Sequence, residues 1–154
     1  MKVVINSEYG GFSLSPKAVK RLAELNGKEC YFFSKEINGE KYNLITMEEA
    51  NKSLFFYAFS IPNPNERIPN STKFSSWSAE KRRKHNELYR SLSLEESPEN
   101  RADPNLIKVV EELGEEASGR LSKLKIVEIP DGVEWTIEEH DGNEWVAEKH
   151  RTWE

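Results

Sequence analysis

The sequence predicts an α+β fold, in a single domain with a mostly antiparallel sheet, and three observations carry that prediction. Two segments, after Ser15-Pro16 and after Asp103-Pro104, have apolar residues at helical spacing. Two pairs of strand-like segments are joined by Asn38-Gly39 and Asp141-Gly142, turns that favour antiparallel hairpins. Clustered hairpins with two main helices indicate an α+β fold, and a chain of 154 residues is long enough to bury a core.

The amino-terminal part begins with a short strand over residues 2–6. A helix follows, because serine at the N-cap and proline at the first helical position are a start signal at Ser15-Pro16. Asn26-Gly27 supplies the stop. The apolar stripe of this helix consists of Ala18, Leu22 and Leu25.

The first hairpin is defined by its two-residue turn, Asn38-Gly39, which needs left-handed backbone at both positions. This turn sets a register in which Phe33 lies opposite Leu44. The apolar run Leu54–Phe59 then predicts a further strand, central in the sheet because both of its faces are apolar.

The middle of the chain, residues 62–100, changes character. It is rich in Pro, Ser and Asn, and it contains one helical stretch, about Ala79 to Leu92. A long segment of this composition predicts a flexible or interacting insert, since long loops in compact domains commonly serve function.

The last third is regular again. Asp103-Pro104 begins a helix that we expect to end at Gly119, and a strand follows over 124–129. A second hairpin, 134–149, turns at Asp141-Gly142. Its two-residue turn places the carboxylates of Glu139 and Glu144 opposite each other, where they would repel. Either the register differs or a cation lies nearby.

The charge of the chain argues against binding to a nucleic-acid polymer. The net charge is −5, and residues 101–154 hold 7 basic and 14 acidic residues, a balance of 7 − 14 = −7. Phosphate-backbone binding favours the opposite sign. The basic cluster Lys81-Arg82-Arg83-Lys84 is flanked by Glu80 and Glu87, and we interpret it as a solvated helix face.

The sequence also favours a cytoplasmic protein without a membrane partner. The longest uncharged apolar run, Leu54–Ile61, is too short to span a bilayer. The residues after Met1 lead into a strand pattern, with no hydrophobic region of a signal peptide. Cys30 is the only cysteine, so neither an internal disulfide nor a cysteine-based zinc site can form.

Motifs of known enzyme classes are missing from the sequence. It contains no phosphate-loop lysine motif, no dinucleotide fingerprint, no nucleophile elbow and no His-Glu-x-x-His. The three histidines, His85, His140 and His150, have no metal-ligand spacing. We therefore expect a non-enzymatic protein with no catalytic residue, no metal site and no cofactor.

Three segments are candidates for ligand binding. The glycines after the first strand would let a ligand approach the backbone while neighbouring rings stack on a base, although a tight connection between strand and helix would need the same residues. An arginine at a helix entrance suits a phosphate or carboxylate, or a salt bridge with the acidic last third. Cationic and aromatic residues at the tail could face a ligand or anchor the chain end. The candidates are Asn6, Tyr9, Gly10, Gly11, Phe12, Arg101, Lys149, Arg151 and Trp153.

The same segments carry a resemblance to a widespread family of small proteins encoded by phages and prophages. The resemblance covers both ends of the chain, whereas residues 62–100 match no part of that family. The matching pieces are Val4-Ile5-Asn6, Tyr9-Gly10-Gly11-Phe12-x-Leu14-Ser15, Arg101-x-Asp103-Pro104-x-Leu106, Val109 to Gly114, Leu124 to Pro130, Glu134-Trp135, Asp141-Gly142 and Glu148-Lys149-His150-Arg151-Thr152-Trp153.

The family is similar to the Thoeris anti-defence sponges, which bind immune signals of the cyclic ADP-ribose type without cleaving them, in pockets shared between subunits. Some of them also hold cyclic oligonucleotides. The resemblance implies a homo-oligomer in the host cytoplasm that sequesters a nucleotide-derived signal, with aromatic rings from Tyr9 to Phe12 on the adenine and Arg101 and Arg151 on the pyrophosphate. The alternative is a structural or regulatory phage protein that contacts a host factor through residues 62–100.

Overall fold

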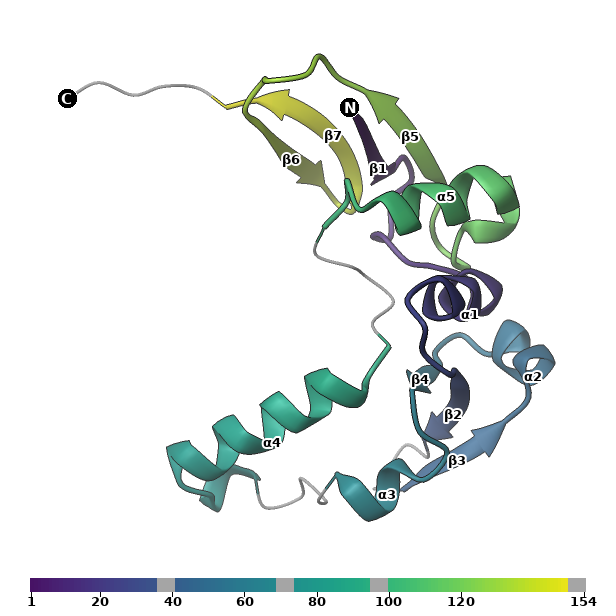
Figure 1. Ribbon diagram of the computed structural model, residues 1–154, viewed down its shortest axis with the longest axis vertical. Coiled ribbons are helices and arrows are strands. Elements are labelled where there is room, and N and C mark those ends of the chain that lie inside the picture. The colour runs from purple at the N-terminus through teal and green to yellow at the C-terminus, as the bar shows by residue number, and fades with distance from the viewer. Residues whose placement is uncertain (36–40, 69–73, 95–99, 150–154) are drawn as a thin grey trace. The chain divides into compact units, whose positions relative to one another are not determined.

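The computed structural model describes residues 1–35, 41–68, 74–94 and 100–149. The chain groups into two compact units, which we call the terminal unit (1–22 and 96–154) and the middle unit (23–95). Helices and antiparallel sheets occur together, so the predicted α+β class is confirmed (Figure 1). The expectation of one domain over 1–154, with 62–100 as an insert, stays a prediction.

Two antiparallel strand pairs form the sheet part of the terminal unit. Strand β1 (Lys2–Asn6) pairs with β5 (Leu124–Glu128), and β6 (Trp135–His140) pairs with β7 (Asn143–Glu148). The second pair has the register expected from its turn, including the pairing of Glu139 with Glu144.

Two helices accompany these strands. Helix α1 (Pro16–Leu25) begins in the terminal unit, where the Ser15 hydroxyl accepts a hydrogen bond from the Ala18 N–H at 3.1 Å. Helix α5 (Pro104–Leu113) begins in the same way, with the Asp103 carboxylate accepting from the Leu106 N–H at 3.0 Å. Both start signals that the sequence contains are therefore used.

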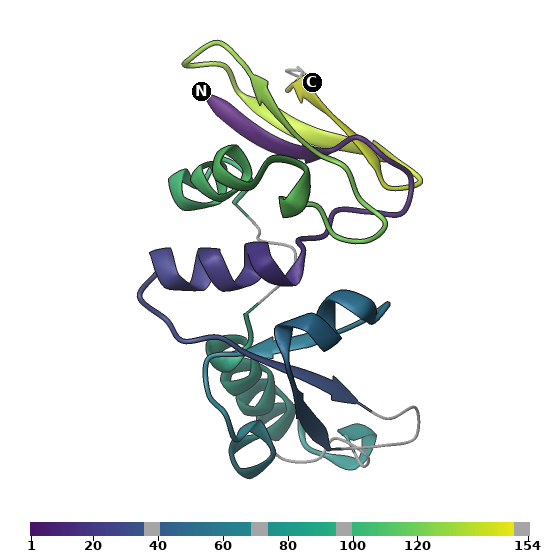
Figure 2. The same cartoon turned by 90° about the vertical axis from the view of Figure 1, so that its right-hand side faces the viewer.

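The core of the terminal unit lies where α5 packs on β1 and β5 (Figure 2). Apolar side chains from β1 and from both helices fill it, which is what an amphipathic helix on a sheet requires. Its buried members include Val3, Val4, Ile5, Leu14, Ala18, Leu106, Val109, Val110 and Ala117.

A three-stranded antiparallel sheet forms the middle unit. Its central strand is β2 (Tyr31–Lys35), with β3 (Tyr42–Ile45) on one side and β4 (Tyr57–Phe59) on the other. The predicted pairing of Phe33 with Leu44 is confirmed. The turn Asn38-Gly39 itself lies outside the described residues.

Helices α2 (Met47–Lys52), α3 (Pro64–Arg67) and α4 (Ala79–Leu92) and the short 3-10 turn η1 (Phe74–Ser76) complete the described part of this unit. One face of the sheet holds a core of Phe33, Phe59 and Ile68, which is extended by partly buried aromatic and aliphatic side chains. Among these, the ring of Tyr89 from α4 meets that of Phe59 edge to face at 5.7 Å.

Two sequence predictions about these elements are wrong. The run Leu54–Phe59 forms a strand only over its last three residues, and that strand is the outer of the three described strands, with a single bridge from Phe59 to Ser93 on its other side. Leu54 and Phe55 are exposed in the connection that follows α2. Helix α2 itself was not predicted, although Thr46 and Glu49 form a capping box, a pattern visible in the sequence.

The helix expected to end at Gly119 ends earlier, because Gly114 adopts a φ of 57° at its C-cap. A 3-10 turn, η2 (Gly114–Ala117), follows. Gly119 serves a different purpose. Its N–H donates to the Ser13 carbonyl at 3.0 Å, and a Cβ at this position would overlap the Ser13 side chain.

Candidate functional site

The glycine turn that follows β1 has backbone that only glycine adopts readily. Gly10 has a φ of 119° and Gly11 a φ of 97°. Gly10 also approaches another segment closely, since a Cβ there would lie 2.9 Å from the Leu121 carbonyl oxygen. Tyr9, the residue directly before Gly10, is 64% exposed.

The turn of the second hairpin packs against this first turn. The Gly10 N–H donates to the Asp141 carbonyl at 3.0 Å. A Cβ on Gly142 would overlap the Gly11 nitrogen and lie 2.7 Å from the Gly10 nitrogen. The two glycine-containing turns therefore meet backbone to backbone, which requires hydrogen in place of a side chain.

Asn6, the last residue of β1, ties these segments together. Its side chain is 0% exposed and donates to the carbonyls of Glu8, at 2.7 Å, and of Gly142, at 2.8 Å. Its Oδ1 accepts from the Lys123 N–H at 2.9 Å. A fully buried amide is stable only when its hydrogen bonds are made, and here they are.

Arg101 has a partner of opposite charge in the same place. Its guanidinium donates two hydrogen bonds to the Glu144 carboxylate, at 2.8 Å and 3.1 Å, and the two side chains are only 14% and 10% exposed. It also lies over the Phe12 ring, 3.6 Å from its centroid. The Glu144 carboxylate accepts a further bond from the Asn6 N–H at 2.8 Å.

Glu144 therefore settles a question raised by the sequence. Opposed carboxylates at Glu139 and Glu144 implied either a different register or a nearby cation, and the cation is Arg101. We call this cluster the glycine junction, and its members are Asn6, Gly10, Gly11, Phe12, Arg101, Gly142 and Glu144.

The structure brings together five of the predicted site residues, which are Asn6, Gly10, Gly11, Phe12 and Arg101. Tyr9 belongs to the same turn but faces outward. Lys149 lies at the far end of the second hairpin, where its N–H donates to the Glu134 carbonyl at 2.9 Å. Arg151 and Trp153 lie outside the described residues.

Beside the glycine junction lies an open groove of about 500 Å³, which we call the Tyr9 groove. Tyr9 forms one wall, and the loop between η2 and β5 supplies Leu121, which is 59% exposed, together with the exposed cations Arg120 and Lys123. Its other lining residues are Glu8, Glu115, Ser118, Ser122 and Leu124.

Sequence reasoning missed the loop residues of this groove. These loop residues could have been identified if the pairing of the first strand with the strand at 124–128 had been predicted. Because that pairing sets Asn6 opposite Leu124, the residues just after Asn6 must lie beside those just before Leu124.

Within the described ranges, no three His, Cys, Asp or Glu side chains gather in a way that could hold a metal ion. No helix in that part of the chain has the length and apolar character needed to cross a membrane. Comparison with models of known protein families, with characterised proteins and with solved structures found no match to this chain.

Proposed function

We propose that the chain is a phage-encoded, non-enzymatic binding protein that sequesters a nucleotide-derived immune signal of the cyclic ADP-ribose type and so blocks a bacterial anti-phage defence. The observation that carries this proposal is the Tyr9 groove. Its volume of about 500 Å³ is of the size that small-molecule sites have, and it lies beside the Tyr-Gly-Gly-Phe turn on which the family resemblance rests.

The groove offers the groups that a nucleotide needs. The exposed ring of Tyr9 supplies a flat face on which a base can stack. Arg120 and Lys123 supply positive charge for phosphates, and the carboxylates of Glu8 and Glu115 accept hydrogen bonds from ribose hydroxyls. The net charge of −5 is then no obstacle, because the positive charge is supplied locally.

This proposal assigns a different role to Arg101 from the one implied by the resemblance. Its guanidinium is engaged by Glu144 and Phe12, so we infer that it supports the turn beneath the groove. The ligand then contacts Tyr9 and the loop 120–123. The groove is open to solvent, which leaves room for a second subunit to complete it, as the sponge resemblance implies.

The test is thermal shift of the purified protein against cyclic ADP-ribose isomers and cyclic oligonucleotides. A ligand present at about 100 times its Kd stabilises the folded state by about 2.7 kcal/mol, which gives a measurable rise in Tm. Heat denaturation should then release the ligand unaltered. A ligand returned in altered form would instead indicate catalysis.

Matched variants locate the site. Tyr9→Ala and Lys123→Ala should abolish the shift. The controls are Phe55→Ala, an exposed ring in the middle unit, and Lys125→Ala, an exposed lysine on β5 that does not line the groove; both should keep it. No shift with any of these nucleotides, or equal loss in the variants and controls, would refute the proposal.

A further inference from the structure

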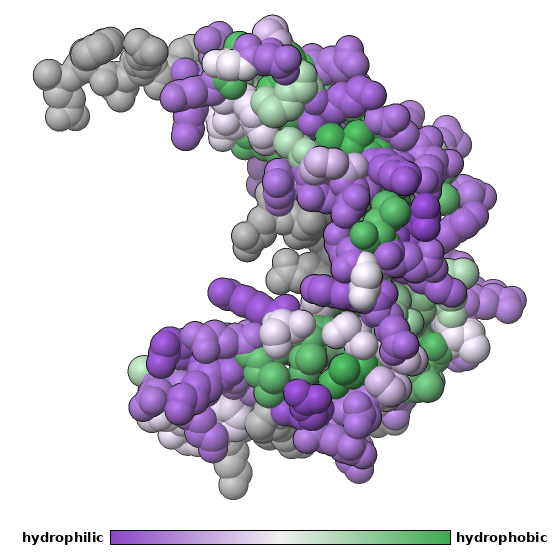
Figure 3. Space-filling view, viewed as in Figure 1, coloured by the Kyte–Doolittle hydropathy of each residue, from purple (hydrophilic) through white to green (hydrophobic). Residues whose placement is uncertain are grey.

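Helix α4 in the middle unit is unusual because none of its 14 residues is buried. Its contacts with the apolar core come from Tyr89 and Leu92, close to its carboxyl-terminal end. Hydrophilic side chains cover the part of the helix seen in Figure 3. The half-buried His85 also meets the Trp77 ring, at 5.4 Å between centroids. Packing therefore explains these contacts, and the exposed remainder of the helix surface is left to be explained by charge.

Three of the cations on or beside this helix have partners. Lys84 pairs with Glu80 at 3.4 Å, and Arg83 pairs with Glu87 at 3.7 Å. The Lys81 ammonium lies over the Trp77 ring, 4.4 Å from its centroid. Such contacts are those expected of a solvated helix that stabilises itself.

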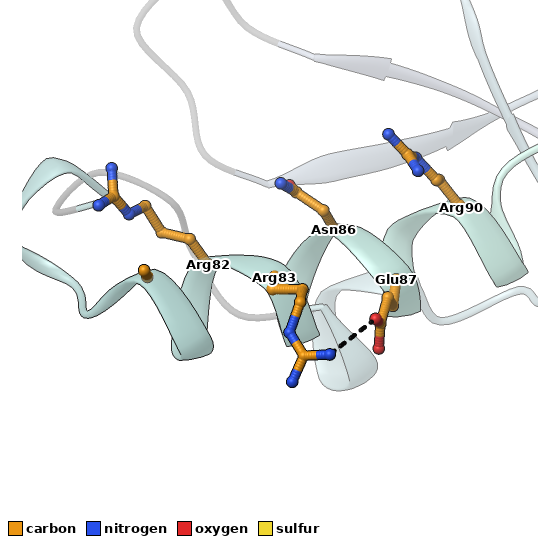
Figure 4. Close-up of a pocket in the computed structure, with 6 residues that line it drawn as sticks. Arg82, Arg83, Asn86, Glu87 and Arg90 are labelled. Atoms are coloured by element: carbon orange, nitrogen blue, oxygen red, sulfur yellow. Dashed lines mark ion pairs between the residues drawn. The ribbon is translucent and has the colours of Figure 1, made fainter.

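Arg82 and Arg90 are different, since neither side chain has an ion pair or hydrogen bond within the described parts of the chain. They lie eight residues apart with Asn86 between them, so all three occupy one face of the helix at steps of about 6 Å. Figure 4 shows these three side chains pointing the same way, while Arg83 and Glu87 point to the other side.

These three side chains line a second open groove, of about 460 Å³, together with Ala79, Arg83 and Glu87. We call the surface formed by Arg82, Asn86 and Arg90 the arginine face. Guanidinium groups bind carboxylates through paired hydrogen bonds, and an amide between them can donate or accept. The steps of about 6 Å match the spacing of carboxylates placed at every fourth residue of an α-helix. The arginine face is thus complementary in charge and in spacing to an acidic helix.

We propose that the arginine face is a docking site for an acidic helical segment of a partner protein. A nucleic acid fits less well, because the surrounding charge is nearly balanced. Residues 61–100 hold 7 basic and 6 acidic residues, a difference of 7 − 6 = +1, and two of the acids, Glu80 and Glu87, are on α4 itself. Binding to a phosphate backbone depends on a broader positive field. The Tyr9 groove belongs to the terminal unit, so either proposal can fail without the other.

The test is fluorescence anisotropy of the full-length protein with a labelled alanine-based helical peptide that has glutamate at every fourth position. The peptide should bind at low salt and dissociate as ionic strength rises. R82A/R90A should weaken binding roughly tenfold, the effect of removing two exposed ion pairs. The matched control, K28A/K41A, removes two exposed lysines of the same unit and should change binding less than about twofold.

Charge reversal distinguishes docking from damage to the fold. R82E/R90E should lose the glutamate peptide and bind the same peptide with lysine in place of glutamate. Circular dichroism should show unchanged helix content, since neither arginine contributes to packing. Equal affinity of R82A/R90A and K28A/K41A would overturn the proposal. Tighter binding of a single-stranded oligonucleotide of equal charge would also overturn it, in favour of nucleic acid.

Discussion

Arg101 in the terminal unit and the pair Arg82 and Arg90 in the middle unit have the same side chain in opposite surroundings. Arg101 is 14% exposed and is held by Glu144 and Phe12. Arg82 and Arg90 are exposed on α4 and have no partner among the described residues.

The difference follows from desolvation. A guanidinium removed from water loses several kcal/mol of hydration unless a counter-ion replaces it, so a nearly buried arginine must be paired within the fold. An exposed arginine stays hydrated at little cost and can exchange water for a ligand. The charge of Arg101 therefore serves the fold, whereas the charges of Arg82 and Arg90 are available for binding.

The largest effect should come from the backbone contact that the glycine junction depends on. Gly142→Ala places a methyl group against the Gly10 and Gly11 nitrogens at a φ of 88°, and we expect a loss of about 3–5 kcal/mol in the free energy of unfolding. Urea denaturation measures it.

The matched control is Gly132→Ala. Gly132 has a similar φ of 80° but open space around the added Cβ, so only backbone strain of about 1–2 kcal/mol should appear. Equal losses in the two variants would mean that the contact between the two turns contributes nothing.

The second largest effect should come from the Arg101–Glu144 pair. Glu144→Gln keeps the shape of the side chain but leaves the guanidinium without a counter-ion, and we expect a loss of about 2–3 kcal/mol. The double variant R101M/E144Q should be less destabilised than the sum of its single variants, because the two residues interact.

The exposed pair Arg82 and Arg90 gives the comparison for the Arg101–Glu144 experiment. R82A/R90A should change the free energy of unfolding by less than about 0.5 kcal/mol, as exposed substitutions usually do. A loss comparable to that of Glu144→Gln would break the distinction between the two environments.

The smallest effect should be a pH dependence from exposed ion pairs of the terminal unit. A hydrogen bond from Arg21 lowers the pKa of Glu112, and one from Lys17 lowers the pKa of Glu116, both below the ordinary value of 4.5. As the pH falls, the two carboxylates take up protons in the unfolded chain before they do so in the folded chain, because their pKa values are higher in the unfolded chain. The stabilisation is therefore present above about pH 4.5 and is lost as the pH falls through the lower folded-state pKa values.

Thermal unfolding followed from neutral to acidic pH measures this dependence. E112Q/E116Q should flatten the fall of Tm on the acidic side, whereas Glu148→Gln, at an exposed position of β7 with no ion pair among the described residues, should leave it unchanged. An equal fall of Tm with pH in the wild-type protein and in both variants would show that these ion pairs do not contribute.

Local signals in the sequence predicted much of the fold. The starts of α1 and α5, the bounds of α4 and the register of both hairpins follow from caps, turns and spacing within a few residues. The run Leu54–Phe59 misled because its apolar residues suggested burial on both faces. Whether such a run is covered depends on what packs against it, and Leu54 and Phe55 are exposed.

The candidate site was predicted only in part, because the sequence identifies local features and not contacts between distant segments. The sequence identified Asn6, the glycine turn and Arg101, and it raised two options for that arginine, an anionic ligand or an acidic residue of the last third. It could not choose between them, since the bonds to Glu144 span 43 residues from Arg101 and 138 from Asn6.

By itself, then, the sequence determined where helices begin, where hairpins turn and which residues carry unusual backbone, because each of these depends on neighbours along the chain. Only the tertiary structure decided that Glu144 neutralises Arg101, and that the loop 120–123 joins Tyr9 to form a groove. These arrangements depend on which distant segments the strand pairing of β1 with β5 and the meeting of the two glycine turns bring within hydrogen-bonding distance.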